Sequence, residues 1–402
     1  MKGPIDIRSE NRQLGAAGSK VLGIGIALAV LGALGSGAAY TMGGGGSRLL
    51  WSYLVNYVFV LSLALGALFF VLVNHLTHAG WSVVVRRFAE AIAANLPVLA
   101  LFAVPLVLGA GTLYHWTHPA PDDHVVINKA AYLNVTFFTV RLVVYFLIWG
   151  GLSLFFFRRS VAQDKSGDPG VTLTMEKVAA PGMFLYALSI TFAAFDILMS
   201  LDPHWFSTVF GVYFFSGAFA AFLALLAVVV FLVQRSGRLT HAITIEHYHD
   251  IGKFLFAFIV FWAYIAFSQY LLIWYANVPE ETIWYARRQT GGWTAMSILL
   301  LVGHFVVPFF LLISRTPKRR PALLTLLALW VLFIHWIDIY WLVMPEMNHE
   351  AKGVVPFALG DVSTLLLLVG LFVALTARRL AGCSLVAEGD PRLVESLTFE
   401  NV

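Results

Sequence analysis

Ten runs of about 20 apolar residues account for most of this chain of 402 residues. A run of that length, wound as an α-helix, crosses the hydrocarbon core of a bilayer. Helices satisfy their own backbone hydrogen bonds in lipid, where irregular chain cannot. The sequence therefore predicts an all-α integral membrane protein with about ten transmembrane helices. The predicted spans are Val21–Tyr40, Leu50–Val73, Phe88–Leu113, Thr136–Phe157, Pro181–Leu201, Thr208–Val233, Gly252–Tyr275, Trp293–Ser314, Pro321–Met344 and Asp361–Ala377.

Composition narrows the class further. Hydrophobic residues make up 59% of the chain and charged residues 12%, against about a quarter charged in soluble domains. The single cysteine, Cys383, excludes a disulfide framework and a cysteine-ligated cluster within the chain. The GGGG run at 43–46 lacks the Lys-Ser/Thr pair of a phosphate-binding loop. The formal net charge of +4 indicates basic loops rather than a nucleic-acid partner.

The basic residues gather on one side of the predicted membrane. With alternating spans, 20 of the 26 Lys and Arg residues fall on the side of the termini and 5 on the opposite side, while Arg141 lies inside a span. Cytoplasmic loops carry the excess of Lys and Arg, so both termini are predicted to be cytoplasmic. The chain divides into an N-terminal tail at 1–20, one polytopic transmembrane domain at 21–380 and a C-terminal tail at 381–402.

Several ionisable residues lie within or beside the apolar runs. The segment FAAFDILMSLDPHWFSTVFGVYFFSG (Phe192–Gly217) contains Asp196, and Asp202 and His204 follow where its apolar run ends. An ionisable side chain at membrane depth is costly, so each is a functional-site hypothesis. The remaining candidates are Arg141, His304, His335, Asp338 and Tyr340, and, at the mouth of the seventh span, His247, His249, Asp250 and Lys253.

These residues suggest a proton pathway, because chains of Asp, Glu and His carry protons across membranes. An outer cluster contains Asp196, Asp202, His204, His335 and Asp338, an inner cluster lies at Glu246–Lys253, and His304 lies between them. Structural alternatives remain open. Arg141 could neutralise Asp196 or Asp338, and Asp202-Pro-His204 could be turn chemistry. His304 could be a hydrogen-bonded core histidine, and His247–Asp250 a solvated helix start.

Three segments resemble the NrfD/polysulfide-reductase-like membrane subunits, and among them the ActF type of bacterial Alternative Complex III. They are Phe192–Gly217, FSQYLLIWYANVPEETIWY (Phe267–Tyr285) and HWIDIYWLVMP (His335–Pro345), and the resemblance covers roughly 20–380. It implies two four-helix bundles, formed by spans 2–5 and 6–9, plus two peripheral helices. It also implies a location in the bacterial inner (cytoplasmic) membrane.

The resemblance further implies a supporting role in a quinol:electron-acceptor oxidoreductase, with proton half-channels and no catalytic activity of the chain alone. Its implied partners are the homologous subunit ActC, the iron–sulfur subunit ActB, multihaem and monohaem cytochrome c subunits, small membrane subunits and lipids. No cofactor or metal is expected on this chain, although the complex could bind menaquinone or its quinol.

Two other classes would also bury acids or histidines in a membrane. A proton-coupled secondary transporter should show inverted repeats with a Gly/Pro-interrupted helix near the midplane. Pro97, Pro105 and Pro308 are the residues that could interrupt spans here. A haem-bearing membrane cytochrome would use His304 and His335 as axial ligands.

Overall fold

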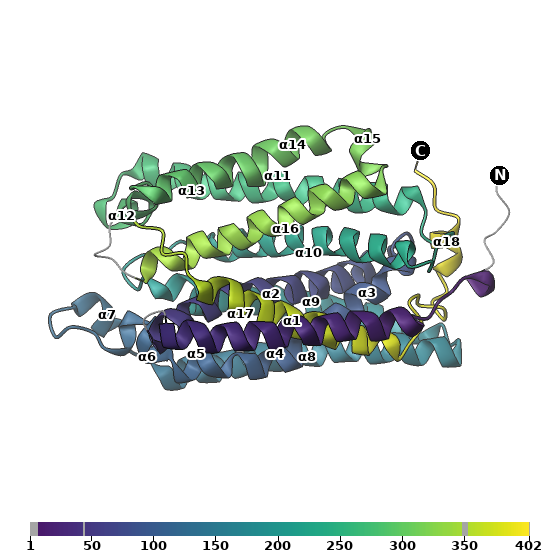
Figure 1. Cartoon of the computed structure of the whole chain (residues 1–402), viewed down its shortest axis with the longest axis horizontal. Helices are drawn as coiled ribbons and strands as arrows, with labels where there is room; N and C mark the ends of the chain where they lie inside the picture. The colour runs from purple at the N-terminus through teal and green to yellow at the C-terminus, as the bar shows by residue number, and fades with distance from the viewer. Residues whose placement is uncertain (1–6, 43–44, 348–352, 402) are drawn as a thin grey trace.

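The chain is a bundle of long helices that run roughly side by side (Figure 1). The computed structural model describes residues 7–42, 45–347 and 353–401, which form helices and connecting loops with no strand among them. Ten spans in this part are long and apolar enough to cross a membrane. The prediction of an all-α, multi-pass integral membrane protein is therefore confirmed.

The ten spans are built from the following helices. They are α1 (Gly15–Met42), α2 (Gly46–Leu76), α3 (Val83–Ala93) with α4 (Leu96–Phe102) and α5 (Val104–Leu108), α8 (Val135–Ser166), α9 (Gly170–Ile197), α10 (Phe210–Arg235), α11 (Ile245–Ala276), α13 (Gly292–Leu300) with η4 (Leu301–Val306) and α14 (Val307–Leu312), α16 (Pro321–Val343) and α17 (Leu359–Ala381). Shorter helices connect or follow them: α6 (Ala110–Leu113), α7 (His124–Asn128), α12 (Pro279–Arg288), α15 (Arg315–Lys318) and α18 (Leu393–Leu397).

The long helices form two four-helix bundles and one peripheral pair. The first bundle contains α2, α3–α5, α8 and α9, and the second contains α10, α11, α13–α14 and α16. The two bundles pack against each other, because α2 of the first bundle contacts α10 and α16 of the second. Helices α1 and α17 pack along each other and against α2. This arrangement matches the expected bundles of spans 2–5 and 6–9.

The two ends of the bundle differ in what they carry (Figure 1). Helix α1 begins and α17 ends at one end, together with α15 and α18, and we call this the terminal end. Helices α7 and α12 lie at the opposite end, which we call the loop end.

Several helices extend beyond their predicted spans, among them α8, which ends at Ser166 rather than Phe157, and α11, which begins at Ile245 rather than Gly252. Helix α1 begins at Gly15, inside the predicted N-terminal tail, and α9 begins at Gly170 with Pro181 in its interior. Both helices continue past the membrane core, where hydropathy no longer marks them but the backbone still gains hydrogen bonds by remaining helical. Lys2 and Lys352, which the charge pattern assigns to opposite sides, lie outside the described residues, as do residues 1–6 of the N-terminal tail.

Two predicted spans are locally irregular because of proline. The third is divided into α3, α4 and α5 at Asn95 and Ala103, just before Pro97 and Pro105. In the eighth, a turn of π-helix at Leu301–Val306 precedes Pro308. Pro308 has no N–H to donate to the carbonyl four residues earlier, which belongs to His304, and its ring clashes with that carbonyl in a regular helix. The wider turn carries His304.

The C-terminal tail is folded rather than loose. Leu385, Val386 and Ala387 are buried, and α18 packs on α3. Asp390 pairs with Arg86, and the N–H of Leu385 donates to the carbonyl of Arg12 at 2.8 Å. These contacts anchor the tail to the terminal end of the first bundle.

Candidate functional site

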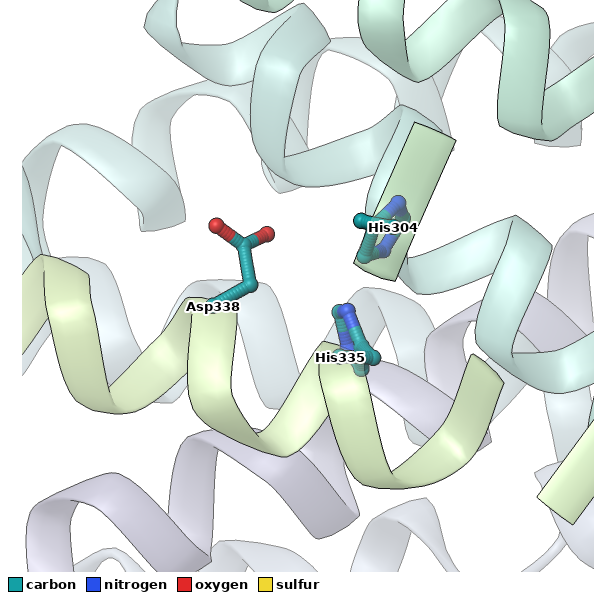
Figure 2. A group of neighbouring side chains, drawn as sticks. All are labelled: His304, His335 and Asp338. Atoms are coloured by element: carbon teal, nitrogen blue, oxygen red, sulfur yellow. The ribbon is translucent and has the colours of Figure 1, made fainter. Parts of the chain in front are cut away.

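Three ionisable side chains meet inside the second bundle (Figure 2). His335 and Asp338 are three residues apart on α16 and share one face of that helix. His304 faces them from the π-helical turn of the eighth span. Each of the three is 1% exposed, and one donor or acceptor atom from each lies within 4.8 Å of the others. The structure therefore brings into one cluster three residues that the sequence placed on two separate spans.

Asp338 is held by two donors from neighbouring helices. The Tyr213 hydroxyl, from α10, donates to Oδ1, and the Trp262 indole N–H, from α11, donates to Oδ2 at 3.2 Å. Neither donor carries a charge, so the carboxyl group is solvated by hydrogen bonds without being neutralised. This makes Asp338 a group that can exchange a proton.

His335 is oriented by a residue from the other bundle. Its Nε2 lies 2.9 Å from Oγ of Ser62 on α2, and that hydroxyl donates its own hydrogen to the carbonyl of Phe59 at 2.7 Å. Because the hydroxyl has one hydrogen, this network assigns the ring proton to Nε2 of His335. Nδ1 then carries a lone pair, and it has no hydrogen-bond partner among the described residues. A Cβ on Gly217 would lie 3.3 Å from Nδ1, so glycine leaves space beside this nitrogen.

His304 is buried without a fixed partner. Neither of its ring nitrogens has a hydrogen-bond partner in the described part of the chain. Its ring centroid lies 3.8 Å from that of Trp262 and 6.5 Å from that of His335. The alternative that His304 is a hydrogen-bonded core histidine therefore does not agree with the structure.

The donor set of two imidazoles and one carboxylate is one that metals use. Metal–ligand bonds of about 2.0–2.2 Å require donor atoms about 3.3 Å apart, closer than the 4.8 Å limit that encloses these three. Both carboxylate oxygens of Asp338 and Nε2 of His335 already have hydrogen-bond partners. Nδ1 of His335 and the ring nitrogens of His304 have no hydrogen-bond partner among the described residues, so each histidine still has a nitrogen that a metal ion could use.

The haem alternative requires His304 and His335 to act as axial ligands. Axial ligation needs one ring nitrogen of each histidine directed at the iron. Nε2 of His335 is occupied by Ser62, and the Trp262 indole lies against the ring of His304. The residues therefore do not support the cytochrome alternative.

A large cavity lies beside the cluster. Its volume is about 850 Å³, and its lining includes Tyr213 and Trp262, the two donors to Asp338. Most of the other lining residues are aromatic or aliphatic, and Gln289 adds an amide. Tyr264 and Phe267 of α11 and Leu301 of η4 also line it and are highly exposed on the outer surface of the bundle. In a membrane protein that surface faces lipid, so an apolar ligand could enter from the bilayer.

Asp196 has different partners. Arg141 binds it with two hydrogen bonds, from Nε to Oδ2 at 2.7 Å and from Nη2 to Oδ1 at 2.9 Å. The Tyr145 hydroxyl adds a third at 2.7 Å, and the ring of Tyr132 lies 3.8 Å from the guanidinium carbon. This bidentate ion pair joins α8 to α9 in the first bundle. It corresponds to the alternative in which Arg141 neutralises Asp196.

Asp202 and His204 belong to a network of charges at the loop end. Asp202 accepts from Arg287 at 2.9 Å, and Arg287 and Arg288 both contact Glu346. Burial lowers the pKa of the Arg288 guanidinium, opposed by the charge of Glu346. His204 is exposed, and its Nε2 lies 2.9 Å from Asp123.

The inner candidates lie at the start of α11. His247 forms a capping box with Thr244, in agreement with the helix-start alternative, but it is buried rather than solvated. Asp250 pairs with Lys253, and His249 is buried with Nδ1 unpartnered in the described structure. Tyr340, two residues beyond Asp338, packs on Trp336 and lies on a different face of α16.

The residues that complete the cluster were not among the sequence candidates. They are Tyr213, Trp262 and Ser62. A tyrosine, a tryptophan and a serine are common in membrane helices for structural reasons, so residue type alone does not single them out. Tyr213 lies within the segment Phe192–Gly217, so its position in that segment could have identified it as a candidate.

Comparison with known proteins adds no assignment. No family model matches the chain, and no curated protein matches it. The class that the fold defines is a multi-pass, all-α integral membrane protein.

Proposed function

We propose that this chain is a membrane subunit of a quinol-oxidising respiratory complex of the Alternative Complex III type, in the bacterial cytoplasmic membrane. Its roles are to scaffold the quinol-oxidising module and to carry protons through the loop-end half of its second bundle. The observation that carries the proposal is the buried cluster of His304, His335 and Asp338 beside a cavity with a lipid-facing mouth.

The cluster suits proton exchange because its groups are near one another and are not neutralised. A carboxylate isolated from water and cations is costly, so taking up a proton is favourable for Asp338. The lone pair on Nδ1 of His335 and the unprotonated ring nitrogen of His304 are alternative acceptors in the same space. Asp196, in contrast, is committed to Arg141. We therefore assign the proton-carrying role to the cluster rather than to Asp196.

The direction of exchange follows from depth. Asp338 is five residues from the loop end of α16, or about 7.5 Å along the helix. Towards the terminal end, 13 residues of α11 separate His249 from Trp262, a rise of about 20 Å. Beyond the buried Asp250, the buried face of that stretch carries Ile251, Gly252, Leu255 and Ile259. On α16 itself, 17 residues separate Asp338 from Pro321 at the terminal end, a rise of about 25 Å. The loop end is therefore much the nearer one, which favours a half-channel over the two-sided access that a transporter needs.

The cavity supports a quinone as the neighbouring ligand. A quinone has a planar ring with two oxygens and a long apolar tail. The cavity offers aromatic walls, the amide of Gln289 and a mouth between α11 and η4. A quinone or quinol bound there would lie one side chain away from Asp338, because Tyr213 and Trp262 line the cavity and also donate to the carboxyl group. The partners of the subunit in this proposal are ActC, ActB and the cytochrome c subunits.

The test uses the assembled complex in proteoliposomes, with proton release and quinol oxidation measured together. Asp338→Asn and His304→Gln should lower the protons released per electron several-fold. His75→Gln is the matched control, since His75 is also buried with both ring nitrogens unpartnered but lies on α2 in the first bundle. Proton release unchanged in both cluster variants would overturn the proton role. Failure of the chain to co-purify with any redox subunit would overturn the assignment to the complex.

A further inference from the structure

A second cavity lies between α8 and α17 at the terminal end. It has a volume of about 420 Å³. Phe157 and Val161 from α8 and Leu375 from α17 line it with apolar surface, and Arg378 and Arg379 line it with positive charge. We call it the α8–α17 groove.

The arginines of the groove have no carboxylate partners in the described part of the chain. Arg378 is exposed and forms no ion pair there, and the same holds for Arg158, which is close enough to Arg379 for their charges to interact. The nearby carboxylates are engaged elsewhere, Asp164 with Arg87 and Glu388 with Arg12. The groove therefore has positive charge that the protein itself does not balance.

One of the guanidinium groups is held in place. Arg379 Nε donates to Oδ1 of Asn95 at 2.8 Å, and Nδ2 of Asn95 donates to Thr376 at 2.7 Å. This contact leaves the two terminal nitrogens of Arg379 available. A guanidinium presenting two N–H groups matches two oxygens of a phosphate. Because Asn95 fixes the side chain, less conformational entropy is lost when an anion binds.

The groove lies where a membrane changes from hydrocarbon to headgroups. Arg158 directly follows the apolar run that ends at Phe157, and Arg378 follows the run that ends at Ala377. The apolar lining therefore faces the acyl region while the guanidinium groups lie at the level of lipid phosphates.

We propose that the α8–α17 groove binds an anionic phospholipid. The phosphate contacts Arg379 and Arg378, with Arg158 adding attraction, and an acyl chain lies on Phe157, Val161 and Leu375. Basic pockets between transmembrane helices bind anionic headgroups in this way. The apolar lining favours a lipid over free phosphate, which would gain nothing from it. This site is separate from the His304–His335–Asp338 cluster and does not depend on the proposed function.

The experiment measures lipid retention by the purified full chain in detergent, using native mass spectrometry. Cardiolipin, phosphatidylglycerol and phosphatidylcholine are titrated separately, and inorganic phosphate is added as a competitor. We expect one anionic lipid to bind per chain in preference to phosphatidylcholine, with little displacement by millimolar phosphate. The double variant Arg158→Gln/Arg378→Gln should weaken binding about 30-fold, taking about fivefold for each arginine at a membrane surface.

Arg235→Gln is the matched control. Arg235 is an exposed arginine at the terminal end of α10, has no carboxylate partner among the described residues and does not line the groove. Anionic lipid affinity should be unchanged in this variant. Equal affinity for all three lipids, equal losses in the control and the double variant, or full displacement by phosphate would each overturn the proposal. Each variant must also keep the thermal stability of the wild-type chain. We expect the double variant to do so, because neither arginine has an ion-pair partner to lose among the described residues.

Discussion

The contact between Ser62 and His335 decides which nitrogen of the histidine faces the cluster. Ser62 donates to the carbonyl of Phe59 within its own helix and accepts from Nε2 of His335 in the other bundle. Ser153 on α8 is equally buried but donates to the carbonyl of Gly150, without a histidine partner. The two serines differ in that one of them satisfies a buried donor from another helix.

Ser62→Ala should therefore lower the free energy of unfolding more than Ser153→Ala does. Removing Ser62 leaves a buried N–H without a partner, which costs about 1–3 kcal/mol. Removing Ser153 loses one local bond to a carbonyl that its helix already uses, which costs well under about 1 kcal/mol. The free energy of unfolding, measured by denaturing-detergent titration in mixed micelles, tests the difference. Equal costs for the two variants would mean that Ser62 does not fix the tautomer of His335.

Asp123 makes the stability of the loop end depend on pH. It is the N-cap of α7, and the N–H of Val126 donates to Oδ1 at 3.1 Å. That backbone hydrogen bond, followed by the contact with His204, lowers the pKa of the Asp123 carboxyl below its ordinary value of 3.8. Since the pKa is lower in the folded chain, its contribution to stability is present above pH 3.8 and is lost as the pH falls through the folded value.

We expect pepsin to cut the loop at 118–133 faster as the pH falls below 3.8. In Asp123→Asn the amide can still cap the helix but cannot be protonated in this range. The extra acid-dependent increase in cutting should therefore be absent from the variant. The measurement is the rate of cleavage at this loop relative to another exposed loop, between pH 2.5 and pH 5. An identical pH profile in both proteins would contradict the role of Asp123.

The sequence could identify candidate functional residues only where burying the side chain in an apolar helix costs free energy. Asp338 and His335 stand out because an idle charge in an apolar run is expensive. Tyr213 and Trp262 do not, because their hydroxyl and indole groups are ordinary in membrane helices. Asp196 also lies in an apolar run, yet in the structure it is paired with Arg141. Hydropathy does not show which helices lie close together, so the sequence could not distinguish Asp196 from Asp338.

At the scale of helices, the pair α1 and α17 is joined through glycine. A Cβ on Gly32 would lie 2.2 Å from the backbone nitrogen of Leu367 on α17, which is too close for any side chain. Gly37, five residues later on α1, has open space where its Cβ would point. Close backbone approach at small residues drives association of helices in lipid.

Gly32→Ala should therefore separate α1 from α17, whereas Gly37→Ala should not. The separation can be read by a disulfide between Ser36→Cys and Ser363→Cys in a Cys383→Ser background, because the two hydroxyl oxygens are 3.2 Å apart. We expect the cross-linked fraction to fall several-fold with Gly32→Ala and to stay unchanged with Gly37→Ala. Efficient cross-linking in both variants would show that the pair does not need the close approach.

Helix positions follow from hydropathy, but helix continuity does not. Ten apolar runs predict ten spans, because length and apolarity are the properties that lipid requires. The breaks before Pro97 and Pro105 and the π-helical turn before Pro308 depend on how neighbouring helices satisfy the freed carbonyls. The π-helical turn directs His304 towards α16. The cluster therefore depends on a local helix distortion that hydrophobic periodicity in the sequence does not predict.

At the scale of the whole molecule, the two bundles and the charge pattern define two unlike ends. The terminal end carries most of the Lys and Arg residues and the folded C-terminal tail, whereas Asp338 lies five residues from the loop end of α16. If the terminal end is cytoplasmic, as the 20 against 5 distribution predicts, the proposed half-channel would open to the outside. The direction of proton release therefore depends on topology.

Topology is tested with single cysteines in a Cys383→Ser background. Asp122→Cys reports on the loop end and Ser166→Cys on the terminal end, and both residues are exposed. A membrane-impermeant maleimide added to sealed spheroplasts should label Asp122→Cys and leave Ser166→Cys unlabelled until the membrane is opened. The physical reason is that transferring the Lys- and Arg-rich loops across the membrane is disfavoured. Labelling of Ser166→Cys in sealed spheroplasts would reverse the topology, and with it the side on which protons from the cluster are released.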